Sequence, residues 1–239
     1  MKNKTAAIIG YTGLIGKNLS EQISKTNFKI DYFNSKNIHK INQKIKYDLI
    51  FCAALPAEKW LANKHSKKDL INTKKLIKNL KKINSNLFIL ISTIDVNFKH
   101  TYGRNRLMLE KFISKSFKKK IIVRLPGVFG YGLKKNVIYD LLNNNNLKNI
   151  YLNDEYQWYD LTLLFDDILK LINKKKTGVF EFYSEPLKNL LLLKFFKKIK
   201  NLRDREKPIV YNFKPAKGYH MSKPDILKRI KKFVTKYEK

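Results

Sequence analysis

The sequence is poor in cysteine, in arginine and in long apolar runs, and each shortage excludes a class of protein. A single cysteine, Cys52, rules out a disulfide framework and a cysteine-based zinc site. The four histidines lack the spacing of metal ligands, and we expect no metal. Lysines interrupt every apolar stretch well short of the roughly 20 residues of a membrane span, and the stretch after the basic start is too short for a signal peptide. These shortages predict a cytoplasmic protein with no membrane span.

Acidic residues are also few, with 19 Asp and Glu against 51 Lys and Arg and a net charge of +32. Such a charge suggests a polyanionic partner. However, only six of the 51 basic residues are arginine, the residue that nucleic-acid-binding surfaces favour for bidentate contacts to phosphate. An AT-rich coding bias would also spread lysine over nearly every predicted helix. We therefore expect small anionic ligands and no specific nucleic acid, and keep a nucleic-acid-associated protein as a third hypothesis.

What the sequence does have is a glycine-punctuated turn at its beginning. The apolar run Ala6–Ile9 ends in Gly10, and Gly13 and Gly16 follow at three-residue spacing before apolar residues at helical spacing. In such a turn the first glycine permits a sharp bend, the second lets a pyrophosphate approach the backbone, and the third lets the helix pack on the strand. The pattern predicts dinucleotide binding, with an ordinary strand-to-helix turn as the alternative.

Strand and helix patterns alternate through the first half of the chain, which predicts parallel strands with crossover helices. After the first strand, strands are expected at 28–33, 47–55, 87–91, 120–125, 178–183 and 208–213, and later helices at 57–82, 102–116, 136–142, 187–199 and 224–237. We predict an α/β fold with a doubly wound parallel sheet of the Rossmann type. Residues 1–239 would form one dinucleotide-binding domain, in which residues from about 130 to 239 contribute a small, interwoven substrate lobe.

The end of the second predicted strand indicates the cofactor. An acidic residue there binds the ribose 2′-hydroxyl of NAD in dinucleotide folds, whereas a polar or basic group accommodates the 2′-phosphate of NADP. Asn34, Ser35 and Lys36 follow this strand, and Asp31 lies earlier, within it. The sequence therefore favours NADP(H) over NAD(H).

A series of short motifs resembles the extended short-chain dehydrogenase/reductase superfamily, also called the NAD(P)-dependent epimerase/dehydratase family. GYTGLIG is similar to the GxTGxxG cofactor turn of that family, and YGRNR to the start of its YxxxK helix. The motifs occur in the family's order over residues 5–185, at Gly10–Gly16, Phe51–Ala54, Ser92–Val96, Tyr102–Arg106, Arg124–Gly130, Gln157–Asp160 and Phe165–Ile168. Their order makes the set far more specific than any one motif.

The resemblance implies a set of cofactor contacts. They lie in the glycine turn, at the ends of the second and third strands, at the motif tyrosine and its cation, and after the strand at 120–125. The residues are Gly10, Thr12, Gly13, Leu14, Ile15, Gly16, Asn34, Ser35, Lys36, Ala53, Ala54, Leu55, Tyr102, Arg106, Leu125, Pro126 and Val128.

The resemblance also implies a catalytic group of three residues. Tyr102 would be the acid/base that exchanges a proton with substrate while the nicotinamide exchanges hydride, and Thr93 would orient the substrate oxygen. Arg106 stands in place of the family's lysine, one helical turn after Tyr102. We expect it to hold the cofactor ribose and to lower the pKa of Tyr102, although an arginine cannot relay a proton. The loop between Thr93 and Tyr102 is shorter than the family's usual loop.

Further residues are candidate substrate contacts: Lys59, Thr93, Asp95, Lys134, Lys135, Asn136, Gln157 and Tyr159. Lys134 and Lys135 would bind a phosphate or diphosphate, or else be solvated lysines that open a helix. Asp95 is either an acid or the cap of the following turn. Ile94 stands where sugar dehydratases carry an acid, which disfavours dehydration.

Together these residues predict an NAD(P)-dependent oxidoreductase or epimerase acting on a nucleotide-sugar-like or phosphorylated carbohydrate, in carbohydrate metabolism. The alternative is a non-catalytic NAD(P)-binding sensor or assembly protein, motivated by the short loop and by Arg106. Proteins of the family often pair through helices that correspond to residues 66–84 and 102–116, so the resemblance also implies a homodimer as an option.

Overall fold

The computed structural model describes residues 4–41, 44–196, 199 and 201–237. The chain forms two compact units, each built from two separate stretches of sequence. The first unit comprises Met1–Arg124 and Thr162–Phe180, and the second comprises Leu125–Leu161 and Glu181–Lys239.

The first unit is built on a six-stranded sheet with the strand order β2-β1-β3-β4-β5-β9. Its strands are β1 (Thr5–Ile9), β2 (Lys29–Phe33), β3 (Lys46–Cys52), β4 (Asn84–Thr93), β5 (Lys120–Leu125) and β9 (Gly178–Glu181). β1 pairs in parallel with both β2 and β3, and β3 pairs in parallel with β4. The chain thus places β2 on one side of β1 and the following strands on the other. In such sheets ligands bind beyond the carboxyl ends of the strands, at the point where the order reverses.

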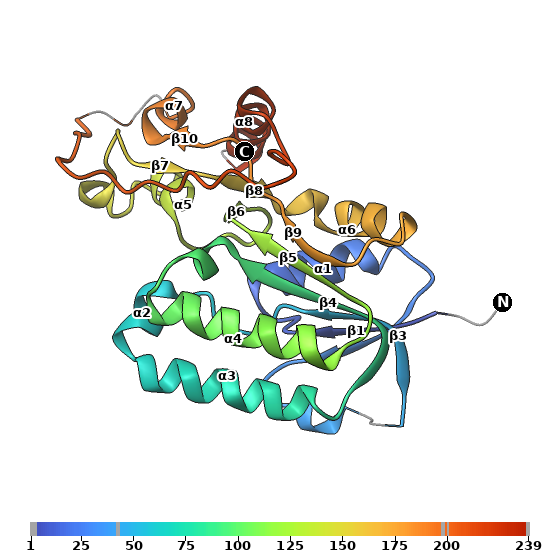
Figure 1. The fold of residues 1–239 in the computed structure, drawn as a ribbon. Coiled ribbons are helices and arrows are strands. Elements are labelled where there is room, and N and C mark those ends of the chain that lie inside the picture. The colour runs from blue at the N-terminus through green and yellow to red at the C-terminus, as the bar shows by residue number, and fades with distance from the viewer. Residues whose placement is uncertain (1–3, 42–43, 197–198, 200, 238–239) are drawn as a thin grey trace. The chain divides into compact units, whose positions relative to one another are not determined.

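Helices cover both faces of this sheet, as Figure 1 shows. α3 (Ser66–Leu80) packs against α4 (Thr101–Ser116) on one face, and α1 (Leu14–Ile23) packs against α6 (Leu164–Asn173) on the other. Because both faces are covered, the central strands are apolar along their length rather than alternating. The buried core under α3 and α4 includes Ile9, Ile50, Cys52, Leu80, Phe88, Leu90, Leu109 and Ile113. The predicted doubly wound α/β fold is confirmed.

In its described residues, the second unit contains two small sheets and three helices. β6 (Gly127–Phe129) pairs in parallel with β8 (Trp158–Asp160), and β7 (Glu155–Tyr156) pairs antiparallel with β10 (Leu187–Lys188). The helices are α5 (Val137–Leu142), α7 (Asn189–Leu193) and α8 (Lys223–Tyr237). α8 buries Ile226, Ile230 and Val234, which are four residues apart and therefore form one apolar stripe.

Three predicted elements differ from the structure. The helix predicted over 57–82 is two helices, α2 (Lys59–Lys64) and α3, because the backbone at His65 leaves the helical region. The helix predicted over 187–199 begins as strand β10 and continues as the short α7. The strand predicted over 208–213 forms a single bridge, from Val210 to Glu155. Short 3-10 turns complete the chain at Ile38–Lys40, Ile94–Asn97, Leu147–Asn149 and Leu161–Leu163.

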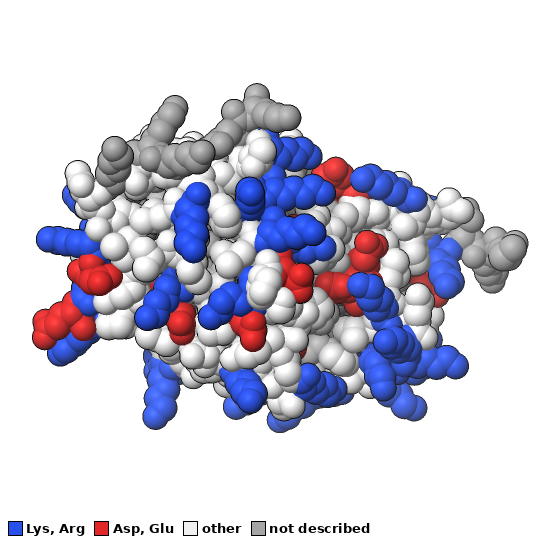
Figure 2. Space-filling model, turned by 90° about the horizontal axis from the view of Figure 1, so that it is seen from above, with Lys and Arg blue, Asp and Glu red and all other residues white. Residues whose placement is uncertain are grey.

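Figure 2 shows one face of the molecule with lysine and arginine side chains spread over it and acidic side chains between them. Charge distributed in this way keeps a surface hydrated. Among the helices of the described residues, none is long and apolar enough to cross a membrane.

Candidate active site

The turn between β1 and α1 requires glycine at two of its three glycine positions. Gly10 has a φ of 92°, and a Cβ on it would collide with the carbonyl group of Ala53. A Cβ on Gly16 would collide with the carbonyl group of Gly10. The Gly10 N–H donates to the Phe33 carbonyl at 2.7 Å, which ties the turn to the end of β2. The sharp bend and the close helix packing predicted from the glycine spacing are both present.

Gly13 leaves the N-terminus of α1 open. It is the N-cap residue, no side chain caps the helix there, and the first turn contains no acidic residue. A Cβ on Gly13 would have only the Gly10 carbonyl oxygen nearby, at 3.5 Å. Free N–H groups at a helix start, together with the helix dipole, form a site for an anion. This open helix start fits the pyrophosphate of a dinucleotide. Thr12 is exposed and Leu14 and Ile15 are half-buried, and all three stay predicted cofactor contacts.

The end of β2 presents the polar residues expected beside the cofactor ribose. Asn34 Oδ1 accepts the Lys36 N–H at 2.8 Å, and Asn34 Nδ2 donates to the Tyr11 hydroxyl at 3.4 Å. Ser35 and Lys36 are exposed. The Tyr11 contact joins this turn to the glycine turn, so both predicted parts of the cofactor site lie on one edge of the sheet.

The end of β3 lies against the same glycine turn. The Ala53 N–H donates to the Ile9 carbonyl at 2.8 Å. Ala53, Ala54 and Leu55 are all half-buried. Their small or apolar side chains suit a flat, apolar ring, and their contact with the cofactor stays a prediction.

Thr93 ends β4 and begins the 3-10 turn Ile94–Asn97. Its hydroxyl accepts the Asp95 N–H at 3.2 Å and lies 3.3 Å from Asp95 Oδ2. Asn97 Nδ2 donates to the Ile94 carbonyl at 3.0 Å. Thr93 is therefore the cap of this turn, which is one of the two roles considered for Asp95.

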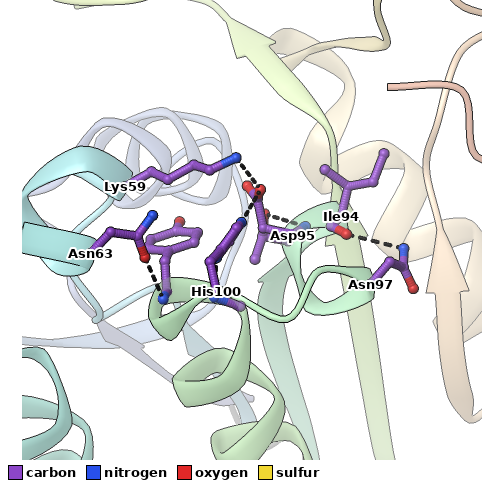
Figure 3. A network of polar contacts seen from close by, with 9 residues as sticks. Lys59, Asn63, Ile94, Asp95, Asn97 and His100 are labelled. Carbon is purple, nitrogen blue, oxygen red and sulfur yellow. Dashed lines mark hydrogen bonds and ion pairs between the residues drawn. The ribbon is translucent and has the colours of Figure 1, made fainter. Parts of the chain in front are cut away.

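Asp95 lies at the centre of a polar cluster in which Lys59 and His100 approach the same carboxylate oxygen (Figure 3). The Oδ1 atom is 2.7 Å from Lys59 Nζ and 3.2 Å from His100 Nε2. The carboxyl side chain is only 13% exposed. Lys59 Nζ also lies 5.3 Å from the centroid of the Phe98 ring, a cation–π distance. Lys59, a predicted substrate contact, is thus held beside Thr93 by Asp95.

Tyr102 lies in the first turn of α4, which packs tightly on the Asp95 turn. A Cβ on Gly103 would collide with the Asp95 carbonyl group, and the Tyr102 N–H donates to Asn63 Oδ1 at 3.0 Å. The Arg106 guanidinium carbon lies 3.9 Å from the centroid of the Tyr102 ring. Burial raises the pKa of Tyr102 and outweighs the lowering by Arg106. Arg106 thus lowers the pKa of Tyr102 as predicted, but the larger effect of burial makes the net shift upward.

Arg106 is a brace between helices. Its side chain is 5% exposed, its Nη1 atom pairs with Asp69 of α3, and its Nη2 atom donates to the Pro56 carbonyl. Asn105 Nδ2 donates to the same Asp69 carboxylate at 2.7 Å. The Arg106 guanidinium is buried and bonded to acceptors of the protein, and its contact with the cofactor ribose stays a prediction.

In the second unit, Asn136 serves the backbone. It has a φ of 114° and caps α5 by accepting the Tyr139 N–H at 3.1 Å, while its Nδ2 atom donates to the Val128 carbonyl at 2.8 Å. Lys134 and Lys135, just before it, are exposed. The lysine pair stays a predicted phosphate contact, whereas the Asn136 amide is already occupied.

Gln157 and Tyr159 are interior residues of the second unit, and their contact with substrate stays a prediction. Gln157 is 1% exposed, and its amide bonds the Ser184 carbonyl and both backbone groups of Phe213. Tyr159 is also 1% exposed and stacks on Phe182 with ring centroids 5.6 Å apart. Both side chains hold the second unit together, because each is surrounded by protein.

The remaining predicted cofactor contacts lie at the end of β5 and just after it. Leu125 ends β5, Pro126 follows it, and both are buried, whereas Val128 is half-buried; their cofactor contacts stay predictions. Asp166 and Asp167, within the Phe165–Ile168 motif, lie in the first turn of α6, where the helix dipole favours negative charge. Within the part of the chain that the structure describes, no group of three His, Cys, Asp or Glu side chains could hold a metal ion.

Two residues of this site escape sequence reasoning. His100 caps α4, since its Nδ1 atom accepts the Gly103 N–H at 3.0 Å. Histidine is not among the preferred N-cap residues, so no local pattern marks it. Asp69 lies 37 positions before Arg106. In the structure Asp69 lies in the first turn of α3, but the sequence predicts one continuous helix over 57–82, so no local pattern marks its role.

The comparisons with known proteins agree with this architecture. No protein-family model and no curated protein sequence matches the chain. Among solved structures, a dTDP-4-dehydrorhamnose reductase from Yersinia enterocolitica has a TM-score of 0.75 at 14% identity, over 98% of this chain and 100% of that one. The same enzyme from Bacillus anthracis, in complex with NADP, has a TM-score of 0.71 at 16% identity, over 99% of each chain.

A UDP-glucose 4-epimerase from Thermotoga maritima, with UDP-glucose, has a TM-score of 0.67 at 14% identity, over 98% of each chain. Identities this low establish the fold. The chain has the Rossmann-type fold of these sugar-nucleotide reductases and epimerases, which are members of the extended short-chain dehydrogenase/reductase superfamily that its motifs resemble.

Proposed function

We propose that this chain binds a nicotinamide dinucleotide at the β1–α1 turn and acts as a reductase or epimerase on a sugar nucleotide. The observation that carries the proposal is the helix start at Gly13, which has no side-chain cap and no acidic residue in its first turn, and where a Cβ would meet only the Gly10 carbonyl oxygen at 3.5 Å. The fold supports the same conclusion, because its structural neighbours are named as enzymes that act on dTDP- and UDP-sugars. When bound, the dinucleotide supplies or accepts the hydride.

Tyr102 is the proposed acid. Because burial raises its pKa, its phenol keeps the proton at neutral pH and donates it to a carbonyl oxygen. The Arg106 guanidinium over its ring is a fixed positive charge that stabilises the phenolate left behind. This role fits a reductase and equally the reductive half of an epimerase reaction.

The polar turn after β2 supports NADP(H) as this cofactor. The acid of that strand, Asp31, accepts the Tyr47 hydroxyl at 2.7 Å and lies within β2. Asn34, Ser35 and Lys36 occupy the strand end instead. A lysine and two neutral polar side chains accommodate a 2′-phosphate better than a carboxylate would.

The test uses protein stripped of copurified nucleotide. NADPH and NADH binding is measured by fluorescence, followed by NADPH oxidation with a panel of 4-keto sugar nucleotides. We expect tighter binding of NADPH, and we expect Tyr102→Phe to lower kcat by about 10²- to 10⁴-fold while the NADPH Kd stays within twofold. Tyr237→Phe, at an exposed position on α8, is the matched control. Turnover by Tyr102→Phe at the wild-type rate would refute its role, and cofactor binding without turnover on the whole panel would favour the sensor alternative.

A further inference from the structure

The turn after β4 contains a carboxylate that the proposed reaction does not use. Asp95 is buried beside Thr93, and Lys59 and His100 reach it from other elements (Figure 3). A charged group in this position affects the hydroxyl of Thr93, so the hydrogen bonds of the cluster decide what Thr93 can offer a ligand.

The ion pair with Lys59 defines how Asp95 takes part in hydrogen bonds. Its Oδ1 atom lies 2.7 Å from the Lys59 ammonium nitrogen, and a carboxylate in an ion pair accepts hydrogen bonds and donates none. His100 adds a second donor to the same Oδ1 atom. Its Nδ1 atom accepts the Gly103 N–H, so the ring proton is on Nε2, 3.2 Å from Asp95. Two donors therefore hold Oδ1, and Oδ2 is the oxygen turned toward Thr93.

The hydroxyl of Thr93 has one proton and two lone pairs. Its proton points to Asp95 Oδ2, since a carboxylate cannot donate, and one lone pair accepts the Asp95 N–H. One lone pair remains on this half-buried side chain. Toward a ligand, Thr93 is thus a hydrogen-bond acceptor.

We propose that Asp95, held by Lys59 and His100, is a positioning residue that makes Thr93 accept a hydrogen bond from a hydroxyl group of the sugar. The site then prefers the alcohol form of a sugar nucleotide over the matching ketone at this position. The inference rests on the proposed function for the identity of the ligand. To donate to a ketone, Thr93 would have to break its hydrogen bond to the Asp95 carboxylate. This loss corresponds to a Kd about tenfold to a hundredfold lower for the alcohol than for the ketone.

Asp95→Asn reverses this arrangement without changing its shape. Lys59 and His100 both donate, so they select the amide oxygen of the new side chain and leave its NH₂ group facing Thr93. Thr93 would then accept two N–H groups and direct its proton at the ligand. We expect the variant to prefer the ketone, and Thr93→Val to lose both preferences.

The experiment measures the Kd of UDP-glucose and of its 4-keto form for the NADP-loaded protein and its variants. Asn97→Ala removes another side-chain bond of the same turn and serves as the control, with an unchanged ratio of the two Kd values. An equal ratio in the wild type and in Asp95→Asn would overturn the proposal.

A second readout needs no sugar and separates this inference from the proposed function. Neutron diffraction of the deuterated wild-type protein locates the deuterium on Thr93 Oγ1. We expect it on the line to Asp95 Oδ2, and a deuterium pointing elsewhere would overturn the proposal. If neither sugar nucleotide binds while the deuterium lies as expected, the proposed function fails and the orientation of Thr93 stands.

Discussion

Helix α1 starts at Gly13, which has no side chain to cap the helix. Replacing Gly13 should change the stability of the fold and the affinity for NADPH in opposite directions. At Gly13 the backbone has φ −78° and ψ 169°, which any residue adopts, and a Cβ there meets only the Gly10 carbonyl oxygen at 3.5 Å. Gly13→Asp therefore folds without strain. If this helix start holds a pyrophosphate, the new carboxylate stands where the ligand must bind.

The two effects have opposite signs. An aspartate cap improves on glycine by a few tenths of a kcal/mol, its charge at the helix start adds about 0.3–1 kcal/mol, and the loss of glycine freedom in the unfolded chain adds about 0.4–1 kcal/mol. We expect Gly13→Asp to be about 1 kcal/mol more stable, with a Tm about 2–4 °C higher. Repulsion between a carboxylate and a phosphate about 4 Å apart is about 4 kcal/mol near a protein surface, so NADPH binding should weaken at least about a hundredfold.

The assay is thermal unfolding with and without NADPH, together with the NADPH Kd from fluorescence. Gly13→Asn is the matched control, because it adds the same bulk and a neutral cap. Its Kd should lie between those of the wild type and Gly13→Asp. A Gly13→Asp protein that binds NADPH as tightly as the wild type would refute the assignment of this turn, whatever its Tm.

Two further predictions concern stability. Arg106→Ala leaves the buried Asp69 carboxylate without its cation and should lower the free energy of unfolding by about 3–5 kcal/mol. Arg106→Lys keeps the charge and should lower it by about 1–2 kcal/mol. Urea midpoints measure both losses, and a loss under about 1 kcal/mol for Arg106→Ala would contradict a stabilising ion pair between Arg106 and Asp69. Burial raises the pKa of the Cys52 thiol from 9.0 to about 12. The unfolded chain therefore releases this proton first, and stability, complete below pH 9, should fall by up to about 1.4 kcal/mol per pH unit between pH 9 and 12. Cys52→Ala should show a shallower fall over the same range, and an identical slope would count against the assignment.

Local sequence patterns were sufficient for the sheet and the glycine turn. Apolar runs bounded by turn residues predict the buried strands, and the spacing of Gly10, Gly13 and Gly16 predicts a geometry that short-range sterics enforce. The α7 region shows where local patterns fail. Its leucines predict one long helix, but Leu187 pairs with Tyr156 in a distant strand, and that pairing decides its conformation.

In the candidate site too, local motifs predict some residues, whereas the long-range partners of those residues cannot be predicted. Thr93 and Tyr102 carry the positions that the motifs assign, at the end of β4 and the start of α4. The partners that set their chemistry come from elsewhere in the chain. Asp69 engages Arg106 from α3, and Lys59 engages Asp95 from α2. No periodicity or spacing in one sequence shows which charged side chains meet across such distances, and these encounters decide whether a motif residue is free for a ligand.

Because Cys52 is the only cysteine of the chain, its reaction with a thiol reagent reports local opening of the sheet. Cys52 ends the strand next to β1, with no exposed surface. A thiol reagent reaches it only when the sheet opens, so the labelling rate of unmodified protein measures how often that happens. A ligand that stabilises the neighbouring glycine turn would lower the labelling rate of Cys52, and no dye or engineered tag is needed to measure it.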